Sequence, residues 1–330
     1  MAQSVTVDAG EDIPGLRALW ASHCAGGPML APMAAQVLLD TLGLGNREVF
    51  GFLNGARPGY AEFRQWIADT VGAPDAELLA RYVRWVAGEE ECHPDDWPRL
   101  AQIAAMAPVL DEAALSHWEA RGYVVLPGAI TAQEVAAVRA LIWQDLRASP
   151  DDPDSWYLAD VDGIMIDRYR HAALEVARRS ARTHKAFAQL WGTENLWATI
   201  DRVGFNPPER AESRFRGSPL HWDVSLVQPV PFGTQGVLYL TDTSADGGAF
   251  RCVPGFHRRL ASWLDGLGAE DPRAVDLSAQ AHAVPGKAGD LVIWRHELPH
   301  GASPNRAATP RLVQYLNFYS PDMPVQEAWR

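Results

Sequence analysis

Two short segments that lie far apart in the chain put the strongest constraint on its fold. One holds His221 and Asp223; the other, residues 289–319, reads as a strand, a turn containing His300, a polar loop and a returning strand that begins near Arg311. Residues i and i+2 of an extended strand point to the same face, so His221 and Asp223 are expected to project together. Two imidazoles and one carboxylate on one side of a metal leave the other side open, a pattern typical of non-haem Fe(II) oxygenases. The sequence therefore predicts a β-rich fold that brings His300 to His221 and Asp223.

Arg311 follows His300 by eleven positions, at the start of the returning strand. A guanidinium group is a rigid fork of donors that grips a carboxylate through two hydrogen bonds. An arginine beside a metal site is therefore expected to bind the far end of a dicarboxylate.

Several segments in the same order along the chain resemble the phytanoyl-CoA dioxygenase family of Fe(II)- and 2-oxoglutarate-dependent oxygenases. Residues 115–146 resemble the opening strand and helix of that family, and residues 247–257 resemble its central glycine- and proline-containing segment. The three candidate ligands and the arginine beyond them fit the same pattern. The resemblance covers roughly residues 115–320.

This resemblance implies a mainly β fold with flanking helices, built on a double-stranded β-helix of the jelly-roll, cupin-like kind. His221, Asp223 and His300 would be the catalytic Fe(II) ligands, and Arg311 would bind the 5-carboxylate of 2-oxoglutarate. With O2 as a further cosubstrate, the expected reaction hydroxylates a small molecule and releases succinate and CO2. Halide-transferring relatives have a small residue where this chain has Asp223. Hydroxylation is thus favoured over halogenation, while desaturation and ring closure stay open.

The second contact to the 2-oxoglutarate carboxylate departs from the family pattern. Relatives often have a hydroxyl two residues after the distal histidine, where this chain has Ala302. Ser303, Thr309 or Gln235 are candidates to replace it. Asn206 and Arg202 share a face of the predicted strand that leads into the site, and we expect them to support it. The other candidates for pocket residues are Trp156, Tyr157, Tyr169 and Arg170.

A competing motif overlaps the site. His296, Glu297 and His300 match the H-E-x-x-H pattern of zinc hydrolases, which requires a helix that places both histidines on one face. Pro299 would disrupt such a helix, and the apolar run at residues 291–294 reads as a strand. We therefore expect His296 and Glu297 to be loop residues near the mouth of the site, with a merely solvated position as the alternative. An inactive jelly-roll module that only binds metal is a further alternative.

Composition limits which classes of binding partner and which cellular compartment are expected. The net charge of −12 disfavours nucleic acids, whose phosphates require a basic surface. No apolar run approaches the roughly 20 residues that span a bilayer, and the first residues do not read as a secretory signal. Three widely separated cysteines indicate reduced thiols, so we expect a cytoplasmic enzyme without membrane partners. A zinc site formed by His23, Cys24, Cys92 and His93 is a weaker hypothesis.

The chain divides into two predicted regions. Residues 1–110 form a helical extension, with helices at 13–22, 34–41, 60–71 and 75–88, and residues 111–330 form the oxygenase domain. The extension is expected to pack on the barrel, with substrate capping or homodimerisation as alternative roles. In the second region, a capping box at residues 131–134 opens a helix, and more helix is expected at 171–190. Strands are predicted at 197–205, 226–229, 236–240, 250–253, 290–294 and 311–319, and residues 206–217 form a surface loop or a mobile lid.

Overall fold

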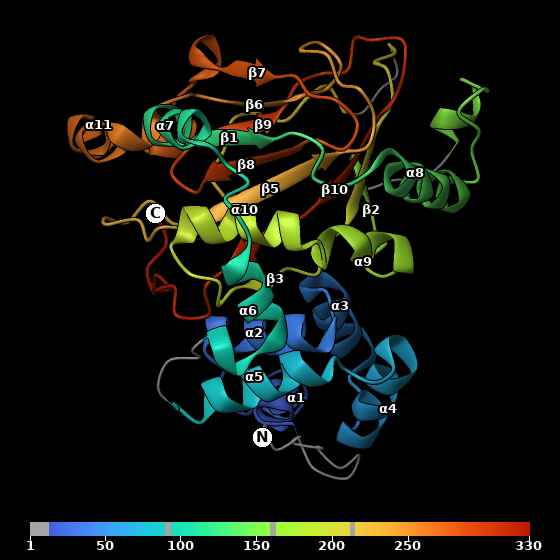
Figure 1. Cartoon of the computed structure of the whole chain (residues 1–330), viewed down its shortest axis with the longest axis vertical. Helices are drawn as coiled ribbons and strands as arrows, with labels where there is room; N and C mark the ends of the chain where they lie inside the picture. The colour runs from blue at the N-terminus through green and yellow to red at the C-terminus, as the bar shows by residue number, and fades with distance from the viewer. Residues whose placement is uncertain (1–12, 90–93, 159–162, 212–214) are drawn as a thin grey trace.

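The chain folds into a helical bundle and an antiparallel β structure, which lie at opposite ends of the molecule (Figure 1). The computed structural model describes residues 13–89, 94–158, 163–211 and 215–330. The helices are α1 Leu16–Cys24, α2 Pro32–Leu42, α3 Asn46–Ala56, α4 Tyr60–Val71, α5 Ala76–Val86, α6 Pro98–Ala105, α7 Glu112–Arg121, α8 Ala132–Leu146, α9 Ala172–Arg178, α10 Ala181–Trp191 and α11 Leu260–Leu267. Short 3-10 helices lie at Pro94–Asp96, Ser155–Tyr157, Phe256–Arg258, Pro272–Ala274 and Ser278–Gln280. No helix among these residues is long and apolar enough to cross a membrane.

Two antiparallel sheets build the β structure. The strands are β1 Tyr123–Leu126, β2 Met165–Ile166, β3 Trp197–Ala198, β4 Val203–Asn206, β5 Thr234–Tyr239, β6 Phe250–Cys252, β7 His282–Val284, β8 Leu291–Arg295, β9 His300–Ala302, β10 Arg311–Tyr315 and β11 Phe318–Tyr319. The larger sheet has the order β1-β8-β5-β10-β4-β2, and the smaller has the order β7-β6-β9. A separate ribbon pairs β3 with β11. This is the predicted jelly-roll architecture with flanking helices.

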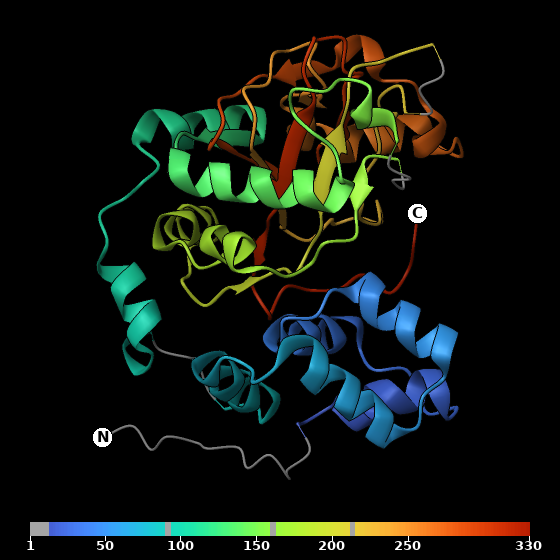
Figure 2. The ribbon, with the colours of Figure 1, turned by 90° about the vertical axis from the view of Figure 1, so that its right-hand side faces the viewer.

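Side chains along the central strands point alternately to the two faces of the large sheet, and each face has its own hydrophobic core. Val237 and Tyr239 of β5 and Trp294 of β8 pack with Phe250 of β6, so one core lies between the sheets. The intervening residues, such as Leu238, pack on the outer face against α8, α9 and α10. Figure 2 shows α8 lying across the strands, with α9 and α10 beside it. One face of the large sheet is therefore covered by helices, and the other faces the small sheet.

The predicted elements agree with the structure where the local signals are strong. The helix over 60–71 coincides with α4, and Thr131 and Glu134 form the predicted capping box of α8. Ser180 caps α10, so the helix expected over 171–190 is two helices. The strands predicted over 197–205 and 311–319 are each divided in two.

The predicted strand at 226–229 is wrong, because these residues are irregular. Pro229 and Pro231 lack the backbone N–H that a sheet requires. The sequence did not predict helices α3, α6, α7 and α11 or strands β2, β7 and β9. The division of the chain at residue 110 stays a prediction.

The helical bundle has its own core and contacts the β structure at the β3–β11 ribbon. Trp197 and Tyr319 of that ribbon are buried in the core of α1–α5. The Trp197 indole donates to Thr41 Oγ1 at 3.0 Å, and the Tyr319 hydroxyl donates to Asp40 Oδ2 at 2.7 Å. Asp40 Oδ1 also accepts from the backbone N–H of Ile200 at 2.9 Å. Burial raises the pKa of Asp40 to about 7, although the hydrogen bonds that its carboxylate accepts from Tyr319 and Ile200 oppose the shift.

We expect Asp40→Ala to lower the free energy of unfolding by about 2–4 kcal/mol, because it leaves buried donors without an acceptor. Chemical denaturation monitored by circular dichroism measures this change. Asp69→Ala on the exposed side of α4 is the control, and we expect it to stay within about 0.5 kcal/mol of the wild type. Equal stability of the two variants would contradict this role of Asp40.

Candidate metal centre

Backbone pairing brings the two candidate histidine ligands together. His221 and His300 form an antiparallel bridge in which each backbone N–H donates to the other carbonyl, at 2.9 and 3.0 Å. Their side chains therefore emerge on the same face, with ring centroids 4.7 Å apart. His300 is the first residue of β9, which corrects its expected position in a turn. Asp223 lies in a bend after this bridge, so the expectation that it extends a strand with His221 is also wrong.

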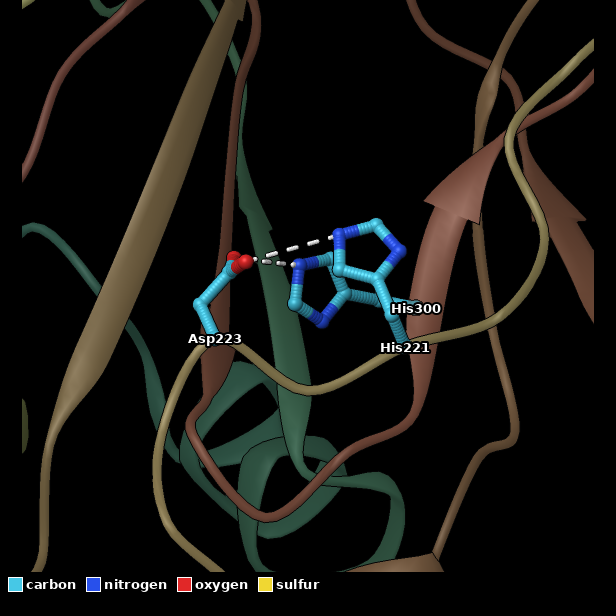
Figure 3. A group of neighbouring side chains, drawn as sticks. All are labelled: His221, Asp223 and His300. Carbon is cyan, nitrogen blue, oxygen red and sulfur yellow. Dashed lines mark hydrogen bonds and ion pairs between the residues drawn. The ribbon is translucent and has the colours of Figure 1, made fainter. Parts of the chain in front are cut away.

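The three side chains converge on a single point (Figure 3). One ligand atom from each of His221, Asp223 and His300 lies within 4.8 Å of the other two. Nε2 of His221 is 3.5 Å from Asp223 Oδ1, and Nε2 of His300 is 3.2 Å from Asp223 Oδ2. His300 is buried, whereas His221 and Asp223 are partly open to solvent. This separation of donor atoms suits one metal ion.

Hydrogen bonds on the far side of each ring orient the two histidines. Nδ1 of His221 lies 2.9 Å from the Pro219 carbonyl oxygen, and Nδ1 of His300 lies 3.1 Å from that of Leu298. A carbonyl oxygen only accepts, so each Nδ1 carries a proton and, in the neutral ring, Nε2 carries the lone pair. Both lone pairs then face the Asp223 carboxylate. With neutral rings, such a group of acceptors is suited to hold a metal cation among them, and a backbone carbonyl on the outer nitrogen is the usual partner of a metal-binding histidine.

Gln235 holds the carboxylate in place. Its amide nitrogen donates to Asp223 Oδ2 at 2.7 Å, and its amide oxygen accepts from the Trp294 indole at 3.1 Å. Burial alone would raise the pKa of Asp223, but without a metal the imidazolium form of His300 donates to this carboxylate, and together with the Gln235 amide and the nearby His221 it holds that pKa well below its usual range. The Asp223 side chain is therefore ionised. Gln235, a candidate contact for 2-oxoglutarate, is engaged instead with a candidate metal ligand.

The three candidate ligands line a cavity with a volume of about 740 Å³, and Arg311 lines the same cavity. Arg311 begins β10, pairs with Asn206 of β4 and is 3% exposed. Nη1 donates to the Gly248 carbonyl at 2.9 Å, but Nε and Nη2 have no hydrogen-bond partner among the described residues. Unsatisfied buried donors of a cation are costly. The two remaining donors, Nε and Nη2, could together bind a carboxylate such as that of 2-oxoglutarate.

The other candidate contacts for that carboxylate lie outside the cavity that the triad lines. Ser303 is buried and its backbone N–H donates to the Ala249 carbonyl. Asn206 is the register partner of Arg311, and its buried amide nitrogen has no partner among the described residues. Thr309 borders a neighbouring pocket that Arg311 also reaches. Their proposed contacts to 2-oxoglutarate stay predictions.

The H-E-x-x-H motif does not form the helix that zinc hydrolases require. Residues 296–299 are a turn between β8 and β9. Nε2 of His296 lies 2.9 Å from the Thr234 carbonyl, and Glu297 forms an ion pair with Arg295 at 3.6 Å. Burial lowers the pKa of His296 to about 4 and raises the pKa of Glu297. Both side chains are half-buried, and His296 lines the cavity of the triad, so they lie beside the site and are not merely solvated.

We expect His296→Ala and Glu297→Ala to retain metal at the stoichiometry of the wild type, because neither side chain belongs to the triad. Metal content after dialysis and elemental analysis measures this. Loss of metal in either variant would contradict the assignment and favour a zinc hydrolase.

Among the other predicted pocket residues, only Arg202 lines the cavity. Trp156 packs in the outer core, Tyr157 donates to the Pro208 carbonyl, and Arg170 forms an ion pair with Glu48 of α3. Tyr169 is also buried away from the cavity. The predicted lid includes residues 212–214, and the hypothetical zinc site includes Cys92 and His93, all outside the described residues. Sequence reasoning missed Thr199, Asp201 and Asn317, which line the cavity from segments without a motif.

Comparison with known proteins decides the family. The model of the family described as "Phytanoyl-CoA dioxygenase (PhyH)" matches residues 118–313, more than half of the chain. The chain belongs to the phytanoyl-CoA dioxygenase family. The matched span begins in α7 and ends in β10, so it includes the metal triad and Arg311 of this family member.

Individual relatives are more distant. A Dictyostelium discoideum protein named "Putative phytanoyl-CoA dioxygenase" is 24% identical over 95 residues, and the match spans 26% of this chain and 26% of that protein. The chain thus matches about a quarter of the length of that relative. The crystal structure of EvdO2 from Micromonospora carbonacea var. aurantiaca has a TM-score of 0.50 at 21% identity, covering 68% of this chain and 96% of that chain. The epimerase SnoN, in complex with Fe3+, alpha ketoglutarate and nogalamycin RO, has a TM-score of 0.45 at 17% identity, covering 63% and 83%. The likeness to EvdO2 supports the fold.

Proposed function

We propose that this protein is an Fe(II)- and 2-oxoglutarate-dependent dioxygenase that hydroxylates a small molecule and releases succinate and CO2. The observation that carries the proposal is the pair of histidine Nε2 atoms that face one carboxylate, with both Nδ1 atoms bound to carbonyl oxygens. Membership in the phytanoyl-CoA dioxygenase family and the unsatisfied donors of Arg311 support it.

Each group has a distinct task in this proposal. His221, Asp223 and His300 would hold Fe(II), and Gln235 keeps the Asp223 carboxylate oriented. Arg311 would bind the 5-carboxylate of 2-oxoglutarate through Nε and Nη2. When bound, the iron and 2-oxoglutarate supply the oxidising chemistry with O2. Phe250, Trp294 and other apolar side chains line part of the cavity and limit access of water.

Asp223 bears on which reaction is favoured. A carboxylate at this position would bind the metal where relatives that transfer halide have a small residue, which favours hydroxylation over halogenation. The inactive metal-binding alternative predicts the same triad but requires no carboxylate anchor. The buried, half-satisfied guanidinium of Arg311 therefore favours the enzyme.

Anaerobic titration of the apoprotein with Fe(II) and then 2-oxoglutarate tests the proposal. We expect a weak visible charge-transfer band that is typical of a keto acid bound to iron through two oxygens. The band should saturate at one equivalent, and succinate should form after O2 is admitted. A folded protein that binds Fe(II) but gives no band on addition of 2-oxoglutarate would overturn the proposal.

A further inference from the structure

An irregular segment between β3 and β4 contributes three polar side chains to the cavity of the metal triad. Thr199, Asp201 and Arg202 line this cavity, whereas Ala198 and Ile200 line a separate cavity of about 640 Å³ beside the helical bundle. Alternate residues from 198 to 201 thus face opposite sides, as in an extended chain. The side chain of Asp201 is therefore directed toward the candidate active site.

Contacts from outside the cavity fix the backbone of this segment. The Ile200 N–H donates to Asp40 Oδ1 of the helical bundle at 2.9 Å. Arg178 Nη2 donates to the Asp201 carbonyl oxygen at 2.7 Å, and the Thr199 N–H donates to the Asn317 carbonyl oxygen at 2.9 Å. Within the segment these bonds use backbone groups only, so they position the Asp201 backbone without forming an ion pair to its carboxylate.

The Asp201 carboxylate has no ion-pair partner within 4.0 Å among the residues that the structure describes. Its Oδ1 accepts from the Arg202 backbone N–H at 2.7 Å. The Arg202 guanidinium binds Asp167 at 3.2 Å instead, and the Arg178 guanidinium binds Glu175 at 2.7 Å. Burial raises the pKa of Asp201, while Arg202 and Arg178 oppose this. A shielded carboxylate without a direct ion pair is costly to the fold and is more often found where a ligand supplies the partner.

The remaining charged groups of the cavity already have assigned partners. Asp223 belongs to the metal triad, Arg311 is assigned to 2-oxoglutarate, and Arg202 is paired with Asp167. Asp201 is the carboxylate that is left for the substrate. A protonated amine supplies both the positive charge and the N–H donors that this carboxylate lacks.

We propose that Asp201 determines specificity by binding a cationic nitrogen of the substrate, so that the enzyme acts on amine-bearing small molecules. This inference rests on the proposed function, because it uses the same cavity. Asp201 is a substrate-binding residue here and takes no part in holding iron or 2-oxoglutarate. The helical bundle contributes to specificity through Asp40, which fixes the segment that carries Asp201.

Three probes with the same six-carbon chain test the proposal: hexylamine, hexanol and hexanoate. Their binding is measured by calorimetry to the anaerobic Fe(II) and 2-oxoglutarate complex of the full chain. Asp201→Asn is the test variant, because an amide oxygen can still accept from the Arg202 N–H while the negative charge is removed. Asp265→Asn, at an exposed position of α11, is the matched control.

We expect the wild type and Asp265→Asn to bind hexylamine at least tenfold more tightly than hexanol, and hexanoate most weakly. In Asp201→Asn, this preference should fall to about twofold or less, with the charge-transfer band unchanged. The inference is overturned if hexylamine does not bind, if hexanol or hexanoate binds as tightly, or if the preference survives in Asp201→Asn. These failures occur with the band present, whereas absence of the band in the wild type would overturn the proposed function itself.

Discussion

Replacement of His221 or Asp223 by alanine is expected to abolish both iron binding and turnover. Each variant leaves two of the three donors that surround the candidate metal position. Even groups that only orient metal ligands are worth about 10–100-fold in affinity, so loss of a ligand should weaken Fe(II) binding by more than about 100-fold. Iron content after reconstitution and succinate release under saturating 2-oxoglutarate measure the two effects.

His282→Ala is a matched control for the histidine variant. Nδ1 of His282 lies 3.0 Å from the carbonyl oxygen of Gln280, two residues earlier, which is the same local contact that His221 and His300 make. His282 is exposed on β7 and lies outside the triad. We expect His282→Ala to retain full iron and activity. A His221→Ala or Asp223→Ala protein that is folded and binds one equivalent of iron with wild-type affinity would remove that residue from the site.

The convergence of His221, Asp223 and His300 and the place of Arg311 in their cavity could be predicted, because the signal lies in residue type and order along the chain. His221 and Asp223 are two positions apart, and Arg311 opens a strand that the apolar pattern already indicated. The position of His300 in β9 was not predictable in the same way. β9 has three residues and exists because it pairs with β6, about fifty positions earlier. Such short strands depend on long-range pairing more than on local propensity.

The position of Asp201 in the cavity could not be predicted from the sequence. The residues around it, from Thr199 to Val203, contain no recognisable motif. Its position follows from Asp40 and Arg178, which lie about 160 and 23 positions earlier in the chain. That its carboxylate has no ion-pair partner within the described part of the chain is a property of the folded arrangement. Half-buried His296 is a similar case, since its partner is the Thr234 carbonyl of a different segment, strand β5.

Arg311→Ala is expected to weaken 2-oxoglutarate binding by on the order of a hundredfold while iron binding is retained. Removal of one member of a buried, hydrogen-bonded charge pair typically costs about 2–5 kcal/mol. Arg311 is not a metal ligand, so the triad keeps its donors. Titration of the Fe(II)-loaded variant with 2-oxoglutarate, followed by the charge-transfer band, measures the affinity, and elemental analysis measures the iron.

Two further variants separate loss of the anchor from loss of the fold. Arg311→Lys keeps the charge and most of the buried volume but lacks the fork, so we expect an intermediate affinity for 2-oxoglutarate. Arg306→Ala removes an exposed arginine that pairs with Glu209 and should leave the affinity unchanged. If both Arg311 variants fold and bind 2-oxoglutarate as tightly as the wild type, Arg311 is not the anchor. The buried Nε and Nη2 donors would then require another acceptor, and Asn206, its partner on β4, is the nearest candidate in register.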